Sequence, residues 1–168
     1  MNAEELRKIQ NPLKEKYRND ATSALITLRA VGKIGEGISC KVETGRAIVQ
    51  AGLHPATGGT GMLACSGDIL LEALVACAGV TLRAVATAIE FKLADGSVKA
   101  EGDLDFRGTL GVDKEAKVGF KKIRLIFQLD TPEGKDRIDT LLKLTEKYCV
   151  VYQTVISGTE ISSEIEIL

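Results

Sequence analysis

The N-terminal part of the chain has the apolar spacing of a helix. Between residues 3 and 18, Leu6, Ile9 and Leu13 recur at helical intervals among charged side chains. This pattern predicts a short amphipathic helix, with a frayed arm as the alternative. We therefore treat residues 1–23 as an N-terminal helical arm.

From residue 24 the pattern becomes strand-like. Short β-prone runs are separated by glycines, at 25–31, 38–44 and 46–51. Such a pattern is typical of a hairpin or meander. The next segment, 52–62, holds four glycines and a proline, which exclude regular structure there.

A long apolar segment follows this glycine-rich loop. Ser66 is a suitable N-cap and Asp68 suits the positive end of the helix dipole, so we predict a helix from here to about Phe91. Apolar residues occupy nearly all of its faces. A helix of this kind is buried, against a sheet or against another subunit.

The second half of the chain predicts a long hairpin and a helix. Two β-type segments, 98–110 and 118–129, flank a turn around Gly111. Thr131, Pro132 and Glu133 then have the residue types that begin a helix.

This helix is expected to run to Tyr148, with an apolar face, and Cys149 then falls at the junction with a short helix at 150–156 that Gly158 ends. The closing residues, 159–168, alternate like a final strand.

Length and charge narrow the classes of protein. At 168 residues the chain fits a single domain over 1–168. Its 22 basic and 23 acidic residues form no basic stripe, which argues against nucleic acid as a partner. The N-terminus lacks the apolar core of a signal peptide, and charged residues interrupt the longest apolar stretch, so we expect a cytoplasmic protein that does not span a membrane.

The motifs that bind metals or nucleotides are missing from the sequence. The four cysteines form no C-x-x-C pair, and His54 is the single histidine, so we expect neither a metal nor another cofactor. The glycine-rich loop lacks the spacing and the lysine of a phosphate loop. It is either a wall of a binding pocket or a flexible connection.

Cys77 and Cys149 lie 72 residues apart in similar apolar helical settings. Each could be a small hydrophobic residue that fills a helix contact, since free cysteine is among the most buried residue types. A redox role would require a group that stabilises the thiolate of one cysteine and a second thiol within disulfide reach. Cys149, at a junction between helices, is the natural partner for Cys77.

The segment from Leu70 to Cys77, preceded by Ser66, Gly67 and Asp68, together with Glu146-Lys-Tyr-Cys149, resembles the osmotically inducible protein C and organic hydroperoxide resistance (OsmC/Ohr) family. The resemblance covers about residues 24–168. It implies an α+β fold, OsmC-like, with antiparallel sheets around a long central buried helix. It also implies an intertwined homodimer with two active sites at the interface.

The resemblance further implies a thiol peroxidase. Cys77 would attack an organic hydroperoxide and become a sulfenic acid, and Cys149 would resolve it to a disulfide. A dithiol reductant, of the lipoyl type among others, would reduce that disulfide. The alternative is a relative that keeps the fold but binds a small apolar or thiol-bearing ligand.

The groups that activate the thiolate depart from the family pattern. The family places a glutamate ten positions before the first cysteine, where this chain has Gly67 and the nearest acid is Asp68. The glycine-rich loop carries no arginine, so Arg46, ahead of that loop, is one candidate, through the fixed donors of its guanidinium. His54 is another, because it titrates in a suitable range. The family's Cys-Pro at the second site is Cys149-Val150 here.

Overall fold

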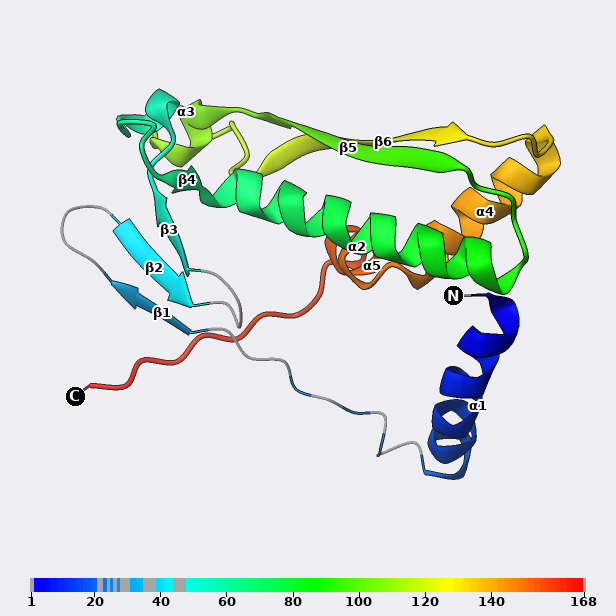
Figure 1. Ribbon diagram of the computed structural model, residues 1–168. Helices are drawn as coiled ribbons and strands as arrows, with labels where there is room; N and C mark the ends of the chain where they lie inside the picture. The colour runs from blue at the N-terminus through cyan, green and yellow to red at the C-terminus, as the bar shows by residue number, and fades with distance from the viewer. Residues whose placement is uncertain are drawn as a thin grey trace.

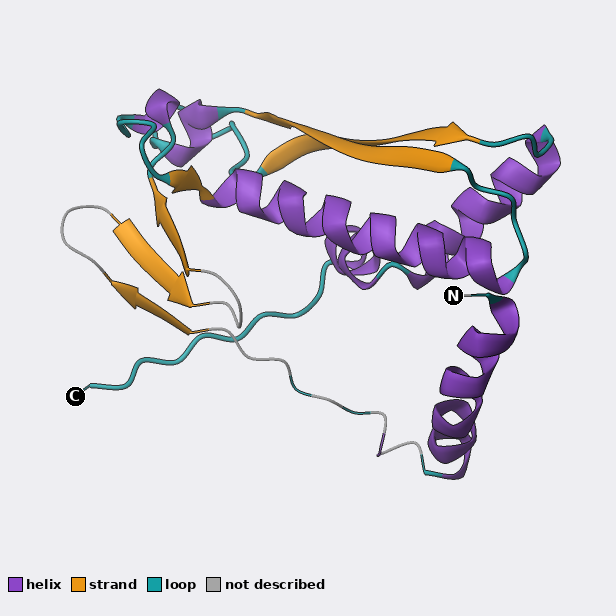
Figure 2. Ribbon diagram, in the orientation of Figure 1, coloured by secondary structure: helices purple, strands orange, loops and turns teal. Residues whose placement is uncertain are grey.

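The computed structural model describes residues 2–20, 23, 25, 27, 31–34, 39–43 and 48–167. One long helix, α2 (Ser66–Ala88), runs through the middle of the molecule (Figure 1). A two-stranded sheet covers one side of it, and two consecutive helices lie on another side, as Figures 1 and 2 show. These elements are β5 (Asp95–Leu104), β6 (Phe120–Asp130), α4 (Lys135–Tyr148) and α5 (Val150–Ser157).

The N-cap of helix α2 lies one residue before the predicted cap, and the helix ends earlier than predicted. Its N-cap is Cys65 rather than Ser66, and its last residue is Ala88 rather than about Phe91. The early end coincides with Glu90, which adopts a left-handed conformation with φ of 54°. Glycine is the residue that usually takes this conformation, so a glutamate at this position does not predict the end of the helix. The N–H of Phe91 then bonds to the carbonyl of Ala86, at 2.8 Å, and directs the Phe91 ring into the core.

The predicted long hairpin is confirmed with different bounds. Strands β5 and β6 pair antiparallel, from Asp95 opposite Asp130 to Leu104 opposite Phe120. β5 stops at Leu104, not at 110, because the Asp105 carboxylate accepts the N–H of Arg107 at 3.2 Å and caps a one-turn helix. That helix is α3 (Phe106–Thr109).

The principal core cluster lies between the C-terminal half of α2 and the inner face of α4. Its buried members are Leu82, Val85, Ala86, Phe91 and Leu141. Partly buried residues of β6, such as Phe127 and Leu129, complete it. Val80, which is on α2 but outside this cluster, is 72% exposed in a single chain.

By its length and composition, α2 could cross a membrane. Among the described residues it is the one helix with this property. The core helix of a soluble protein has the same composition, so this is weak support for a membrane segment.

The N-terminal sheet is a meander, as predicted. It contains three antiparallel strands and a short fourth strand that runs parallel to the third: β1 (Val31–Ile34), β2 (Ser39–Glu43), β3 (Ile48–Gly52) and β4 (Ala64–Cys65). The first strand was predicted at 25–31, and most of that range lies outside the described residues. β1 pairs with β2 from Val31 opposite Glu43 to Ile34 opposite Cys40.

The N-terminal arm is helical, as predicted. Helix α1 (Ala3–Asn19) has a capping box, in which Asn2 and Glu5 each accept the other's backbone N–H. An ion pair of 3.4 Å between Arg7 and Glu90 joins α1 to the turn that follows α2. Of the predicted apolar face, Ile9 and Leu13 remain about half exposed.

Two predictions for the last third of the chain are wrong. Helix α4 starts at Lys135 with Gly134 as its N-cap. Thr131 instead stabilises the turn before it, because its hydroxyl donates to the Lys92 carbonyl, at 2.6 Å, and accepts the N–H of Glu133. Residues 159–167 form no strand. Alternation alone does not make a strand, which also needs a neighbour for its ladder.

Candidate functional site

The structure brings Cys77 and Cys149 together. Cys77 lies in the middle of α2 and is half-buried, whereas Cys149 separates α4 from α5 and is 1% exposed. Both residues are free thiols, and they lie close enough for each to shift the pKa of the other. The pair on which the sequence prediction rests therefore forms one cluster.

The backbone around Cys149 accounts for its position. Its N–H donates to the carbonyl of Thr145, at 2.9 Å, and completes the last turn of α4. Its extended conformation, with φ of −75° and ψ of 109°, interrupts the helix, and its carbonyl then accepts the N–H of Gln153 at the start of α5. Cys149 is thus both the C-cap of one helix and the N-cap of the next.

The N-terminus of α5 faces Cys77. The backbone N–H groups of Val150 and Val151 lie near enough to the Cys77 sulfur to lower the pKa of that thiol. The first N–H groups of a helix have no partner within that helix and carry the positive end of its dipole. A thiolate at Cys77 therefore receives donors that α5 cannot use itself.

Thr81 is a further neighbour of Cys77 that the sequence analysis missed. It follows Cys77 by four residues on α2, so both side chains lie on one face of the helix. Its hydroxyl lies near enough to the Cys77 sulfur to lower the pKa of that thiol. The signal for it was present in the sequence, as a hydroxyl residue one helical turn after the cysteine.

The surroundings move the pKa values of the two thiols in opposite directions. Burial raises the pKa of Cys77, but hydrogen bonds from the Val151 N–H, the Cys149 thiol, the Thr81 hydroxyl and the Val150 N–H outweigh it, and the net pKa is lowered. Burial raises the pKa of Cys149, and the hydrogen bond to Cys77 and the charge on Cys77 raise it further. Cys77 is thus the more acidic thiol of the pair, and Cys149 is the less acidic one.

The other predicted activating groups lie elsewhere in the chain. Asp68 is in the first turn of α2, nine residues before Cys77, which is about 13 Å along a helix. His54 follows β3, where its ring stacks on Phe106 at a centroid distance of 4.9 Å. Its Nδ1 accepts the N–H of Ala56, at 3.0 Å. Arg46 lies outside the described residues.

The glycine-rich loop forms a wall of a pocket, as one interpretation of the sequence expected. Loop residues including His54 and Thr57 line a cavity of about 380 Å³ together with Cys65 and Gly67 at the start of α2. This cavity lies at the N-terminal end of α2, about 18 Å from Cys77 by the helical rise between residues 65 and 77.

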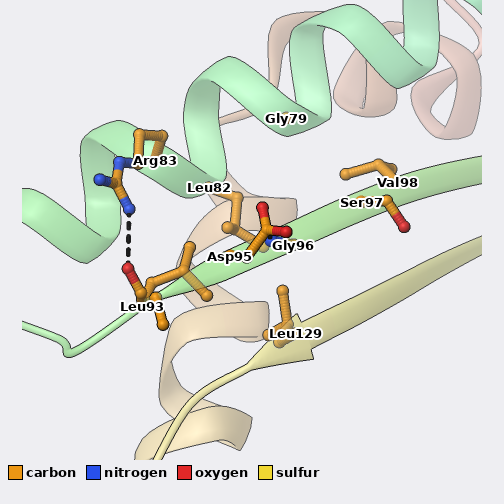
Figure 3. Close-up of a pocket in the computed structure, with 10 residues that line it drawn as sticks. Gly79, Leu82, Arg83, Leu93, Asp95, Gly96, Ser97, Val98 and Leu129 are labelled. Carbon is orange, nitrogen blue, oxygen red and sulfur yellow. Dashed lines mark hydrogen bonds between the residues drawn. The ribbon is translucent and has the colours of Figure 1, made fainter.

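A second cavity lies between α2 and the start of β5 (Figure 3). Arg83 lies on its wall and donates to the carbonyl of Leu93, at 3.1 Å. Arg83 follows Cys77 by six residues, so its side chain projects from α2 about 120° away from the cysteine. Over the described part of the chain, no group of three histidine, cysteine or acidic side chains could hold a metal ion.

Replacing Thr81 with valine is expected to reduce the thiolate character of Cys77. The valine keeps the volume but loses a donor to a charged group, which is worth about 1.5–3 kcal/mol, so alkylation of Cys77 at neutral pH should slow on the order of tenfold. A lowered pKa means that the thiolate forms above the folded-state pKa and is lost as the pH falls through it. The pH profile of the variant should therefore move to higher pH.

The measurement is the rate of iodoacetamide labelling of Cys77 as a function of pH, followed by peptide mass spectrometry. Thr87→Val is the matched control, because the Thr87 hydroxyl donates to the Arg83 carbonyl on the same helix, at 2.9 Å. Equal profiles for the Thr81 and Thr87 variants would contradict the role given to Thr81.

Solved structures with the same fold come from several bacteria. An OsmC-like protein from Mycoplasma pneumoniae matches with a TM-score of 0.66 and 16% identity, over 79% of this chain and 90% of that one. An organic hydroperoxide resistance protein OsmC from Legionella pneumophila matches with a TM-score of 0.62 and 19% identity, over the same shares. One from Elizabethkingia anophelis matches with a TM-score of 0.64 and 15% identity, over 80% and 91%.

These identities are low enough that the structural matches establish the fold alone. No curated protein matches the sequence. A family model described as OsmC-like protein matches residues 59–164, a span that runs from the glycine-rich loop through both cysteines. The chain belongs to the OsmC-like protein family.

Proposed function

We propose that this protein is a thiol-dependent peroxidase that reduces organic hydroperoxides, with Cys77 as nucleophile and Cys149 as resolving cysteine. The observation that carries the proposal is that Cys77, whose pKa is lowered, and Cys149, whose pKa is raised, are neighbours that shift each other's pKa. The thiolate is the nucleophilic form of cysteine, and the resolving thiol needs to be within disulfide reach of it.

The proposed first step forms a sulfenic acid. The Cys77 thiolate attacks the terminal oxygen of the hydroperoxide, the O–O bond breaks, and the electron pair leaves with the alkoxide, which takes a proton to become an alcohol. Cys77 gains the OH group and is oxidised, while the peroxide is reduced. The N–H groups of Val150 and Val151 would hold the sulfur in place during this attack.

The second step forms the disulfide. The Cys149 sulfur attacks the sulfenic sulfur of Cys77 and loses its proton, and the OH group of Cys77 leaves with a proton as water. An external dithiol, such as a lipoyl group, then reduces the disulfide to two thiols and is itself oxidised. Val150 in place of proline leaves a backbone N–H available at this turn.

We further infer that one OsmC-like domain spans residues 1–168, acts in the cytoplasm in defence against oxidative stress, and works as an intertwined homodimer. Two features support a dimer. The apolar surface of α2 is only partly covered in a single chain, as at Leu70, which is 41% exposed, and the isoleucines of the C-terminal segment are unburied. Ile161, Ile165 and Ile167 are about nine-tenths exposed, which a strand added to a second copy would cover.

The proposal is tested by oxidising the reduced protein with one equivalent of cumene hydroperoxide and mapping its disulfides by mass spectrometry. A bond between Cys77 and Cys149 is expected, along with loss of the peroxide and appearance of cumyl alcohol. Cys65, a free thiol about 18 Å along α2 from Cys77, is an internal control and is expected to remain reduced.

If Cys77 and Cys149 both remain reduced while the peroxide persists, the peroxidase proposal fails. That result would favour the alternative function, the binding of a small apolar or thiol-bearing ligand on the same fold. A bond between Cys65 and Cys77 would instead contradict the assignment of the resolving cysteine.

A further inference from the structure

We propose that the groove between α1 and α2 receives the apolar chain of the hydroperoxide, so that the N-terminal arm determines which substrates fit. This inference rests on the proposed function. It assigns a specificity role to a helix that lies outside the residues matched by the family model, 59–164.

The groove has the size and the lining of a small-molecule site. Its volume is about 600 Å³, within the usual range of roughly 300–1,000 Å³ for ligand pockets. Leu6 and Gln10 of α1 form one side, and Thr81 and Ala84 of α2, with Tyr148 of α4, form the others. Most of its lining residues are apolar, as a hydrocarbon chain requires.

One end of the groove lies one helical turn from the reactive cysteine. Thr81 lines the groove, and its hydroxyl also lowers the pKa of Cys77. Tyr148 of α4 also lines the groove, and it immediately precedes Cys149 in the chain. A peroxide whose terminal oxygen meets Cys77 can therefore extend its alkyl chain past Thr81 and Ala84 toward α1.

Helix α1 forms the other wall of the groove. The Arg7–Glu90 ion pair links α1 to the turn after α2, and Leu6, the residue before Arg7, is partly buried. A side chain on this wall sets the far limit of the groove. A short substrate would react at Cys77 without reaching it, whereas a longer chain would bury its last methylenes against it.

The test compares two peroxides, tert-butyl hydroperoxide and 1-octyl hydroperoxide, as the ratio of their kcat/KM values. Leu6→Asp puts a charge on the groove wall, and Ala84→Phe fills the groove. Two lost methylene contacts are worth about 1.6 kcal/mol, so each variant should lower the octyl-to-tert-butyl ratio roughly tenfold. The rate with tert-butyl hydroperoxide, which has the shorter chain, should fall less than the rate with 1-octyl hydroperoxide.

Ile9→Asp is the matched control, because Ile9 is on the same helix, is 57% exposed and does not line the groove. Circular dichroism and melting curves establish that each variant is folded. The inference is overturned if folded Leu6→Asp and Ala84→Phe keep the wild-type ratio, or if Ile9→Asp lowers it equally.

A second measurement separates this inference from the proposed function. Binding of 1-octanol, the product, to the reduced protein is measured by calorimetry with wild type, Leu6→Asp and Ile9→Asp. If the wild type reduces neither peroxide, the peroxidase proposal fails, but octanol binding that is weakened by Leu6→Asp alone still supports the groove. If octanol does not bind to the wild type, the groove is not the chain site.

Discussion

Replacing Cys77 with serine is expected to reduce peroxide consumption to the uncatalysed rate. A serine hydroxyl at this place stays protonated, because the hydrogen bonds that stabilise a thiolate are far too weak to ionise an alcohol. Cys149→Ser should behave differently. It leaves the nucleophile intact, so one equivalent of peroxide per chain is consumed and a sulfenic acid then persists at Cys77.

These outcomes are measured by peroxide assay over the first turnover and by dimedone trapping with mass spectrometry. Cys65→Ser is the control, since Cys65 precedes α2 at its far end, and it should retain wild-type turnover. Turnover by Cys77→Ser would place the nucleophile elsewhere. A sulfenic acid on Cys149 in the wild type would reverse the two roles.

Replacing Leu141 with alanine is expected to destabilise the protein by about 2–5 kcal/mol, the usual cost of a cavity at a fully buried leucine. Leu141 is 0% exposed and belongs to the core cluster with Leu82 and Phe91. The loss is measured as the shift of the urea midpoint at constant slope. Leu110→Ala, at a residue that is 55% exposed, should cost less than about 1 kcal/mol.

This substitution should also affect the candidate site. The Thr145 hydroxyl donates to the Leu141 carbonyl, at 2.8 Å, and the Thr145 carbonyl accepts the N–H of Cys149, at 2.9 Å. A loosened α4 therefore holds Cys149 less firmly, and disulfide formation should slow in Leu141→Ala but not in Leu110→Ala. A variant with wild-type stability would show that the core does not depend on Leu141.

The helices were predictable because their signals are local. The periodicity of α1, the apolar length of α2 and the glycine after α5 are each contained in a short window. Two of the errors fall at the ends of elements, where a single residue decides the boundary. The end of α2 depends on a glutamate in a left-handed conformation, and the end of β5 depends on a cap by Asp105.

The closing strand failed for a different reason. Residues 159–167 have the alternation of a strand, but a strand is completed by its neighbours and not by its own sequence. Whether this segment becomes a strand depends on whether another strand lies beside it. The sequence of the segment alone does not contain that information.

For the site, the resemblance to a family identified the two cysteines, but proximity in sequence misplaced their neighbours. Asp68 was proposed as the nearest acid and His54 for its titration range, yet both lie at the N-terminal end of α2, away from Cys77. Thr81 and the start of α5 are the groups in contact with the sulfur. Thr81 follows from helical spacing, whereas the approach of α5 depends on how α4 packs against α2.

The donors around Cys77 also bear on how readily the proposed disulfide would be reduced. They stabilise a negative sulfur, which exists in the dithiol form and disappears when the bond forms. Stabilising the reduced form raises the reduction potential of a disulfide and makes it a stronger oxidant. Because the start of α5 lies against Cys77, the proposed disulfide would be easy to reduce. A dithiol of moderate reducing strength would then be enough to restore the two thiols after each turnover.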